Sequence, residues 1–273
     1  DLSNWDFEKD GIVDLKGEWR FVWEEFVEPI PSDVFREKYR GTIEVPATWP
    51  SQAHPGKPGE FLPGDGYATY GLTIRLPPHT NMNSLGFTIV HAQSAALWQV
   101  HSVDGTQELG VMAQGVPGSS LESTVPIWLT LSTTLAAGIQ PHVSLLVHVS
   151  NFRHARGGLW SSPNLGLEKP VSQSESFRFF LNASIFGILF IIGLYHFILF
   201  LQRREDTPSL FFALLCSAAA VRQWTTGLIS QEIGKGLSND GFEVLLALEY
   251  LGMPFLMMSS GLFIHALVPG LYF

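Results

Sequence analysis

Residues 181–201 read LNASIFGILFIIGLYHFILFL, and this stretch decides the fold of the second part of the chain because it contains no charged residue. At a rise of about 1.5 Å per residue, a helix of this length spans roughly 30 Å, the thickness of the hydrocarbon core of a bilayer. Two further stretches, 208–229 and 244–268, are nearly as apolar. Buried helices of a large soluble core seldom contain uncharged runs this long. The sequence therefore predicts three transmembrane helices.

Charges are unevenly distributed around this stretch. The chain of 273 residues has 16 Lys and Arg and 25 Asp and Glu, so that 15% of its residues are charged, against about 25% in typical soluble domains. Residues 1–176 hold 11 basic and 19 acidic side chains, whereas residues 177–273 hold only 5 and 6. The clustered Lys and Arg of a nucleic-acid-binding protein are missing. We expect a domain boundary near residue 176, a lipid bilayer as partner and no nucleic acid.

The orientation of the chain follows from its short connections. The connection at 202–206, QRRED, carries Arg203 and Arg204 directly after the first predicted span, whereas the loop 230–243 has only Lys235. Basic residues next to spans are enriched on the cytoplasmic side of membranes. The sequence therefore predicts a bacterial inner-membrane protein with a periplasmic N-terminal domain and a cytoplasmic 202–206 connection.

Two smaller features agree with this localisation. The only cysteine, Cys216, lies inside the second predicted span, so the outer domain has no internal disulfide, as is common for periplasmic domains. The chain opens at Asp1 rather than at Met, and we expect that a leader has been removed.

Polar residues within the predicted spans form a candidate pair. Arg222 lies about 10 Å and Glu249 about 8 Å below the outer ends of two antiparallel spans, so their depths match. An unpaired charge at this depth costs several kcal/mol, which favours pairing inside the bundle. Alternatively, Arg222 extends towards the headgroups beside Trp224 and Glu249 meets a different helix. His196 and His265 are expected to pack within the bundle, and no metal site is predicted.

Residues 1–176 have the pattern of an all-β sandwich, with short alternating segments between loops rich in Gly and Pro. In the segment 17–26, Trp19, Phe21 and Trp23 share one face. Further strands are predicted at 67–77, 85–91, 96–103, 125–132 and 142–151. Trp19, Trp98 and Trp128 lie within strands and are expected in the core.

The order of these segments carries a resemblance. GxWxF at 17–21 is followed by VPATWP at 45–50, GYATYGLTIRLP at 66–77, ALWQVHSVDG at 96–105 and LLVHVSNF at 145–152. This series resembles the jelly-roll, galactose-binding-like domain that precedes the catalytic barrel in beta-galactosidases and beta-glucuronidases. With the spans that follow, the chain resembles bacterial seven-transmembrane receptors with diverse intracellular signalling modules. Where members of this family usually show an Asn-Gly-like turn, this chain has Asp104-Gly105, which has equivalent turn chemistry.

The resemblance implies more chain than the sequence contains. Only three of seven implied helices are present, so we expect a truncated seven-helix bundle. The resemblance places four more helices and a cytoplasmic output module after Phe273. In this family the module is a diguanylate cyclase, a histidine kinase, a nucleotide cyclase or a phosphatase, and the sequence does not choose among them.

No catalytic residues are predicted in this chain. Glycoside hydrolysis needs two carboxyl groups held about 5–10 Å apart around the sugar, and Glu24, Glu25, Glu60 and Asp65 are expected to face water on strands or loops. The motifs GxSxG and HExxH are absent, as is a phosphate-binding glycine loop. We therefore expect a non-enzymatic segment that needs no cofactor.

Ligand binding has better candidates. Sugar and glycan sites combine a flat aromatic face with hydrogen-bonding side chains on loops. The segment NFRHARGGLW at 151–160 and the loop around residue 50 supply such groups, and the predicted ligand-binding residues are Trp49, His54, Asn151, Arg153, His154, Arg156 and Trp160. Alternatively, Trp49 and Trp160 close the ends of the sandwich, and the two arginines contact lipid headgroups or helix loops. Paired arginines would suit an anionic ligand such as a carboxylate or phosphate.

The sequence therefore predicts a sensor fragment. A periplasmic jelly roll would bind a small ligand, a carbohydrate or a carboxylate, and would act on the membrane bundle through a short connection at 168–180. Two alternatives stay open: a membrane-anchored adhesion or scaffold protein that binds a partner protein, and a carbohydrate-binding subunit of a transporter or envelope assembly. A homodimer is also left open.

Overall fold

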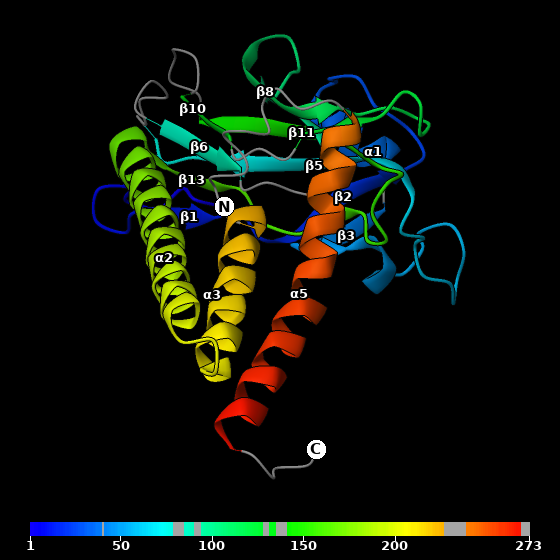
Figure 1. Ribbon diagram of the computed structural model, residues 1–273. Helices are drawn as coiled ribbons and strands as arrows, with labels where there is room; N and C mark the ends of the chain where they lie inside the picture. The colour runs from blue at the N-terminus through cyan, green and yellow to red at the C-terminus, as the bar shows by residue number, and fades with distance from the viewer. Residues whose placement is uncertain are drawn as a thin grey trace. The chain divides into compact units, whose positions relative to one another are not determined.

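The computed structural model describes residues 1–39, 41–78, 85–89, 94–127, 131–134, 141–226 and 239–268. Contacts divide the chain into two compact units, Asp1–Ser174 and Glu175–Phe273. The first unit consists mainly of β-strands, and the second consists of long helices (Figure 1).

A seven-stranded antiparallel sheet forms one layer of the first unit. Its strands lie in the order β3 (Thr42–Val45), β2 (Gly17–Trp23), β5 (Gly66–Arg75), β11 (His142–Asn151), β7 (Ala95–Ser102), β8 (Glu108–Val116) and β9 (Val125–Pro126). The two longest strands, β5 and β11, pair along their full length, from Arg75 opposite His142 to Gly66 opposite Asn151. The predicted strands at 17–26, 67–77, 96–103 and 142–151 are therefore confirmed, with ends that differ by a few residues.

A four-stranded antiparallel sheet forms the second layer. Its order is β1 (Val13–Asp14), β13 (Asn164–Leu167), β6 (Leu85–Ile89) and β10 (Leu131–Thr134). A small separate sheet joins β12 (Gly158–Leu159) to β4 (Ala47–Thr48). The single strand predicted at 125–132 corresponds to two strands, β9 and β10, and residues 128–130 between them lie outside the described part of the chain.

The predicted turn at Asp104-Gly105 connects β7 to β8. Gly105 has a φ of 73°, a left-handed conformation that glycine adopts without a steric penalty. The Asp104 carboxylate accepts hydrogen bonds from the amide of Thr106, at 3.1 Å, and from its hydroxyl, at 2.9 Å. This local network explains why the aspartate can take the place of asparagine in the turn.

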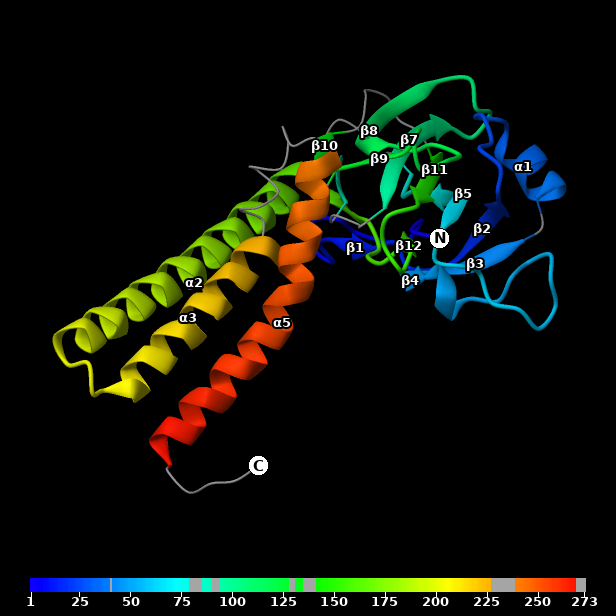
Figure 2. The same cartoon turned by 45° about the vertical axis from the view of Figure 1, so that its right-hand side comes forward.

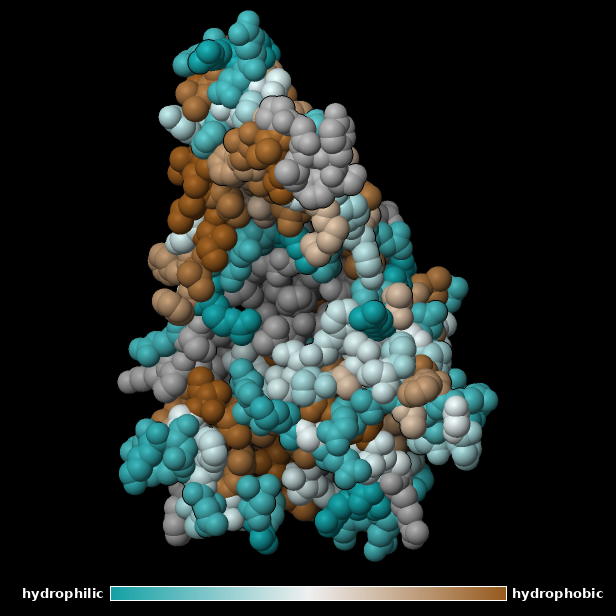
Figure 3. All heavy atoms as spheres, turned by 90° about the horizontal axis from the view of Figure 1, so that it is seen from below, coloured by the Kyte–Doolittle hydropathy of each residue, from teal (hydrophilic) through white to brown (hydrophobic). Residues whose placement is uncertain are grey.

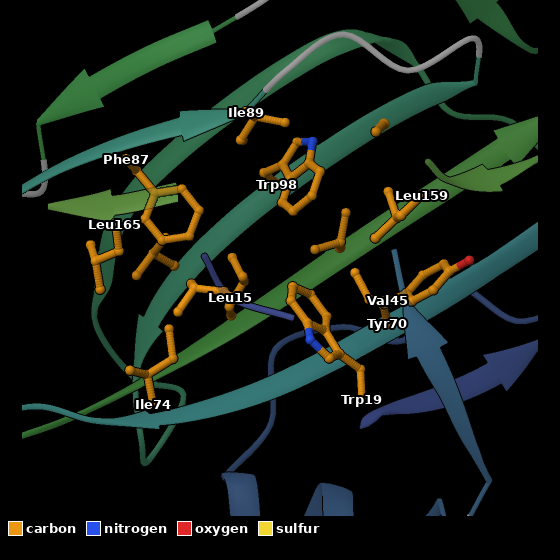
Figure 4. Close-up of a cluster of buried hydrophobic side chains, with 14 of the residues drawn as sticks. Leu15, Trp19, Val45, Tyr70, Ile74, Phe87, Ile89, Trp98, Leu159 and Leu165 are labelled. Carbon is orange, nitrogen blue, oxygen red and sulfur yellow. The ribbon is translucent and has the colours of Figure 1, made fainter. Parts of the chain in front are cut away.

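The hydrophobic core lies between the two large sheets (Figure 4). Alternate residues of β2 point inwards, and Trp19 and Phe21 are almost completely buried. The four-stranded sheet contributes Phe87 and Leu165 from the opposite side. Each large side chain of this kind removes roughly 150–250 Å² from water, at about 25 cal/mol per Å². The predicted core positions of Trp19 and Trp98 are confirmed, whereas Trp128 lies outside the described residues.

Within the described residues, three long helices follow the sandwich: α2 (Glu168–Gln202), α3 (Thr207–Thr226) and α5 (Asn239–Leu267). By length and composition, two segments within the described helices could cross a membrane, Ser176–Gln202 and Glu243–Leu267. Only 6% and 17% of their apolar windows are buried, unlike the core helices of a soluble protein. Exposed Phe, Ile, Leu and Met side chains gather on the surface of these helices (Figure 3). Such a surface is stable in lipid and unfavourable in water.

The second predicted span, 208–229, is helical in α3 but is not among the segments apolar enough to cross a membrane. Arg222 and Gln223 near its end lower its hydropathy. Residues 227–229 lie outside the described part of the chain. The structure thus supports two candidate spans, and the larger seven-helix bundle remains a prediction.

The prediction for residues 168–180 is corrected by the structure, because this segment is the beginning of α2 and not a loop connection. β13 ends at Leu167 and α2 begins at Glu168, so the chain passes from strand to helix without a linker. The only proline of the segment, Pro170, lies in the first turn, where a missing amide hydrogen breaks no helical hydrogen bond. The helix can therefore start before the apolar stretch and continue through it (Figure 2).

Candidate functional site

Trp49, the first of the predicted ligand-binding residues, lies in the core. It begins the short helix η1 (Trp49–Ser51) directly after β4. Its side chain is 0% exposed, and its indole Nε1 donates a 2.6 Å hydrogen bond to the Tyr70 hydroxyl. The Trp23 ring meets it edge-on at 4.9 Å, and Gly157 packs so closely that a Cβ would lie 2.3 Å from the indole. The ring therefore has no face free to bind a ligand. Trp49 closes the end of the sandwich instead, which is the alternative role considered for it in the sequence analysis.

Tyr70 is held in its neutral form by the same packing. Burial raises the pKa of its phenol well above the ordinary value, although the hydrogen bond from Trp49 acts in the opposite direction. A neutral phenol can accept from the indole and donate its own proton at the same time. The pair therefore satisfies two polar groups inside the core.

Asn151, the last residue of β11, ties two loops together. Its side-chain amide donates to the carbonyl oxygens of Gly64, at 2.7 Å, and His154, at 2.6 Å. Its Oδ1 accepts from the His154 amide at 3.2 Å, and the residue is only 2% exposed. Both donors and the acceptor are occupied within the protein, which makes Asn151 a structural anchor for the segment that follows.

His154 is also directed into the protein. Burial lowers the pKa of its imidazole, and the backbone amide of Arg156 donates to Nδ1 at 3.1 Å. The neutral ring packs edge-on against Trp160, with a centroid distance of 5.0 Å. The Trp160 indole in turn donates to the Arg156 carbonyl at 3.0 Å. These contacts fold the loop 152–157 onto itself.

The remaining predicted residues of this group keep some access to solvent. Arg156 is exposed, Arg153 and Trp160 are half-buried, and His54 is half-buried beside the Trp23 ring at 6.2 Å. His54 Nδ1 accepts a 3.1 Å hydrogen bond from the Gly56 amide. The loop therefore presents the Arg156 side chain and parts of Arg153 and Trp160 to solvent, a combination that can bind an anion or a sugar hydroxyl.

Metal chemistry has no support in the described residues, which include no group of three His, Cys, Asp or Glu side chains able to hold a metal ion. The four carboxylates considered for hydrolysis, Glu24, Glu25, Glu60 and Asp65, are all exposed.

The structure brings the two predicted intramembrane residues together. Arg222 on α3 donates from Nη1 to the backbone carbonyl of Glu249 on α5, at 3.4 Å. Its guanidinium is also close enough to act electrostatically on the Glu249 carboxyl. On the neighbouring position of α3, the Gln223 amide bonds to the side-chain oxygen of Asn182 on α2. Polar contacts thus connect α3 to both α2 and α5.

A hollow that the sequence analysis did not identify lies on the outer face of the seven-stranded sheet, beside the short helix α1 (Ser32–Lys38). Arg20, Ser32, Arg36 and His101 contribute to its lining. The alternation of β2 does place Arg20 on the face opposite Trp19. Neither α1 nor its position over the sheet could be derived from such a pattern, because α1 spans only seven residues.

Comparisons with known proteins find similarity only at the level of solved structures. No family model and no curated protein match the chain. A glycosyl hydrolase family 2 member from Bacteroides cellulosilyticus overlaps with a TM-score of 0.40 at 12% identity, over 57% of this chain and 20% of the other. The beta-glucuronidase of Faecalibacterium prausnitzii gives 0.40 at 13%, over 58% and 31%. Beta-glucuronidase 2 of Bacteroides uniformis, a calcium-binding mutant, gives 0.39 at 18%, over 56% and 17%.

These overlaps concern part of each protein. The chain spans between about a sixth and a third of the length of the three enzymes. Neither the activity nor the ligands of those enzymes follow for this chain.

Proposed function

We propose that this chain is the front part of a membrane-bound sensor, of the bacterial seven-transmembrane receptor class that its segment order resembles. A jelly-roll domain, residues 1–176, would bind a small ligand outside the cytoplasm. Residues 177–273 would contribute the first helices of the bundle, and an output module would follow on the cytoplasmic side.

The direct passage from β13 into α2 is the observation that carries this proposal. β13 pairs with both β1 and β6, so its end is held by the sheet. The next residue, Glu168, already belongs to a helix that continues to Gln202 and contains a candidate span. A change in the position of β13 would therefore reach α2 without being absorbed by a flexible linker. A ligand can shift such an equilibrium only by its difference in affinity for the two states, typically about 1–3 kcal/mol.

The turn between α2 and α3 supports a cytoplasmic position for residues 202–206. Arg203 and Arg204 are exposed there, and Asp206 caps α3 by accepting from the Ser209 hydroxyl at 2.6 Å. The acid is thus used locally, while both arginines stay available to the anionic surface of the inner leaflet. Residues 227–238 lie outside the described part of the chain.

For the ligand, the proposal retains a carbohydrate or carboxylate. Arg153, Arg156, Trp160 and His54 remain candidates at the sandwich end because each keeps some exposure. We assign Trp49, Asn151 and His154 a structural role, which is to support these loops.

The coding sequence beyond Phe273 tests the receptor class most sharply. We expect four further apolar spans followed by a cytoplasmic cyclase, kinase or phosphatase module. A reading frame that stops soon after Phe273, or continues into a periplasmic domain, contradicts the receptor class and favours an anchored adhesion or envelope protein.

A further inference from the structure

We infer that the hollow beside α1 is a binding site for a small hydroxylated carboxylate, a molecule of the size of a sugar acid. The hollow has a volume of about 270 Å³. Ligand pockets for drug-sized molecules are typically about 300–1,000 Å³, so this one suits a smaller molecule. The inference gives the ligand class of the proposed function a binding site other than the sandwich-end loop, and it does not depend on the signalling part of that proposal.

The sheet register builds the floor of the hollow. Thr73 on β5 lies opposite Ser144 on β11, and Ser144 lies opposite His101 on β7, so these three form one row across the sheet. In the next row, Arg20 on β2 lies opposite Gly71 on β5. Because alternate residues of a strand share a face, both rows point away from the sandwich core.

Gly71 lets α1 close one side of the hollow. A Cβ at this position would lie 2.4 Å from the Phe35 ring of α1, so only glycine allows the ring to rest on the sheet. Phe35 packs there with Val22, Val27 and Leu146 in a small cluster of its own. This cluster fixes α1 over the sheet and gives the hollow an apolar wall next to its polar floor.

Two buried polar atoms in the lining have unsatisfied hydrogen-bonding capacity. Ser32 is 3% exposed and His101 is 6% exposed, and neither Ser32 Oγ nor His101 Nε2 has a hydrogen-bond partner within the described residues. A buried polar atom without a partner costs about 1–3 kcal/mol. Burial also lowers the pKa of His101, against the opposing effect of Glu108, so the imidazole stays neutral. A bound molecule with hydroxyl groups could hydrogen-bond to both side chains.

The charges of the lining favour an anion. The lining contains two guanidinium groups, those of Arg20 and Arg36, and one carboxylate, that of Glu18. The Glu18 carboxylate already accepts a 2.6 Å hydrogen bond from the Thr42 hydroxyl. Arg36 Nε donates to the Ser32 carbonyl at 3.4 Å, and its two Nη groups have no acceptor among the described residues. A guanidinium group of this kind binds a carboxylate through two parallel hydrogen bonds.

Calorimetric titration of the full chain in detergent with D-glucuronate, with D-gluconate as a second probe, tests the inference. D-Glucose and sorbitol are the matched neutral controls, since each replaces the carboxylate of one probe by a hydroxymethyl group. We expect at least one acid to bind and its neutral partner to bind at least about tenfold more weakly.

Variants locate the binding. Arg36→Gln should weaken binding of the acid about tenfold or more, because a charge-assisted hydrogen bond is worth about 1.5–3 kcal/mol. Arg36 is exposed on α1, so this variant is expected to fold normally. Arg20→Gln is the second variant. Arg75→Gln is the control, since Arg75 lies two residues after Thr73 on the same face of β5 but outside the hollow lining, and it should change the affinity less than twofold.

Four results overturn the inference. The first is that neither acid binds, and the second is that Arg75→Gln weakens binding as much as Arg36→Gln. The third is that binding is lost in Arg153→Gln or Arg156→Gln but is unchanged in Arg36→Gln, which assigns the ligand to the sandwich-end loop. Binding of neutral sugars alone would also contradict the hollow site while leaving the proposed sensor function intact.

Discussion

At the scale of single residues, the buried hydrogen bond between Trp49 and Tyr70 is a contact whose removal should destabilise the sandwich. Tyr70→Phe leaves the buried Trp49 indole without its acceptor, and we expect a loss of about 1–3 kcal/mol in the free energy of unfolding. Trp49→Ala also leaves a large cavity and should cost about 3–5 kcal/mol. Thermal unfolding of the full chain followed by circular dichroism measures both. Unchanged melting temperatures would show that the pair does not support the fold.

Two buried histidines, His101 and His154, give the β-sandwich an acid-sensitive stability. Burial lowers the pKa of both His101 and His154 below the ordinary value of about 6.5. As the pH falls below about 6.5, the unfolded chain binds protons that the folded chain does not, so stability decreases down to the folded pKa.

We therefore expect a lower melting temperature at pH 5.5 than at pH 7.5, with a smaller decrease in His154→Gln. Glutamine retains an acceptor for the Arg156 amide but cannot be protonated. A decrease of equal size in the variant would exclude His154 as a cause.

Residue types alone could not separate the roles of the predicted ligand-binding residues. Trp49, Asn151 and His154 are the types that bind sugars, and they also close a sandwich and tie down loops. Only the structure shows that the amide of Asn151 is occupied by Gly64 and His154. Gly64 is 87 residues away from Asn151 in sequence, so no local pattern predicts that contact.

At the scale of elements, polar contacts connect α3 to both of its neighbours in the helical unit. If Arg222 and Glu249 act as a pair, Arg222→Gln and Glu249→Gln should not be additive. We expect a coupling of at least about 0.5 kcal/mol in a double-mutant cycle, measured by unfolding in detergent. Gln223→Ala with Glu249→Gln is the control cycle, because Gln223 bonds to α2 instead. Additive effects in both cycles would show that Arg222 and Glu249 have no coupling free energy.

The early start of α2 is open to a direct test. If α2 begins at Glu168, amides just before the apolar stretch should exchange slowly with deuterated solvent. Ser176→Pro should speed exchange around this position, because an internal proline removes a helical hydrogen bond at a cost of about 3 kcal/mol. Ser176→Ala is the matched control and should keep the slow rates. Fast exchange of these amides in the unmodified chain would show that residues 168–180 form a non-helical connection, as expected from the sequence.

Some strands and helices could be predicted from the sequence, and others could not. The alternation in 17–26 and 142–151 is clear because one face of each strand packs on the core, and the apolar runs are clear because they are long enough to span the hydrocarbon core of a bilayer. The start of α2 was missed because EKPVSQSESFRFF has neither an apolar period nor a strong break. α1 was missed because two helical turns carry too little periodicity, although Phe35 anchors it.

At the scale of the whole molecule, the account depends on where the two units reside. The sandwich has a dense core of its own, and the helices expose large apolar side chains that need lipid. A membrane assignment explains both properties in one chain. The proposed orientation places the connection at 202–206 and the loops of the sandwich on opposite sides of the bilayer.

Labelling of single cysteines in intact cells with a membrane-impermeant maleimide tests this assignment most directly. In a Cys216→Ser background, Lys57→Cys places a thiol on an exposed sandwich loop, and Glu205→Cys places one in the connection after α2. We predict that the cysteine at position 57 is labelled once the outer membrane is permeabilised, whereas the cysteine at position 205 is labelled only after the inner membrane is also disrupted. Equal labelling of both, or labelling of position 205 alone, would contradict the account.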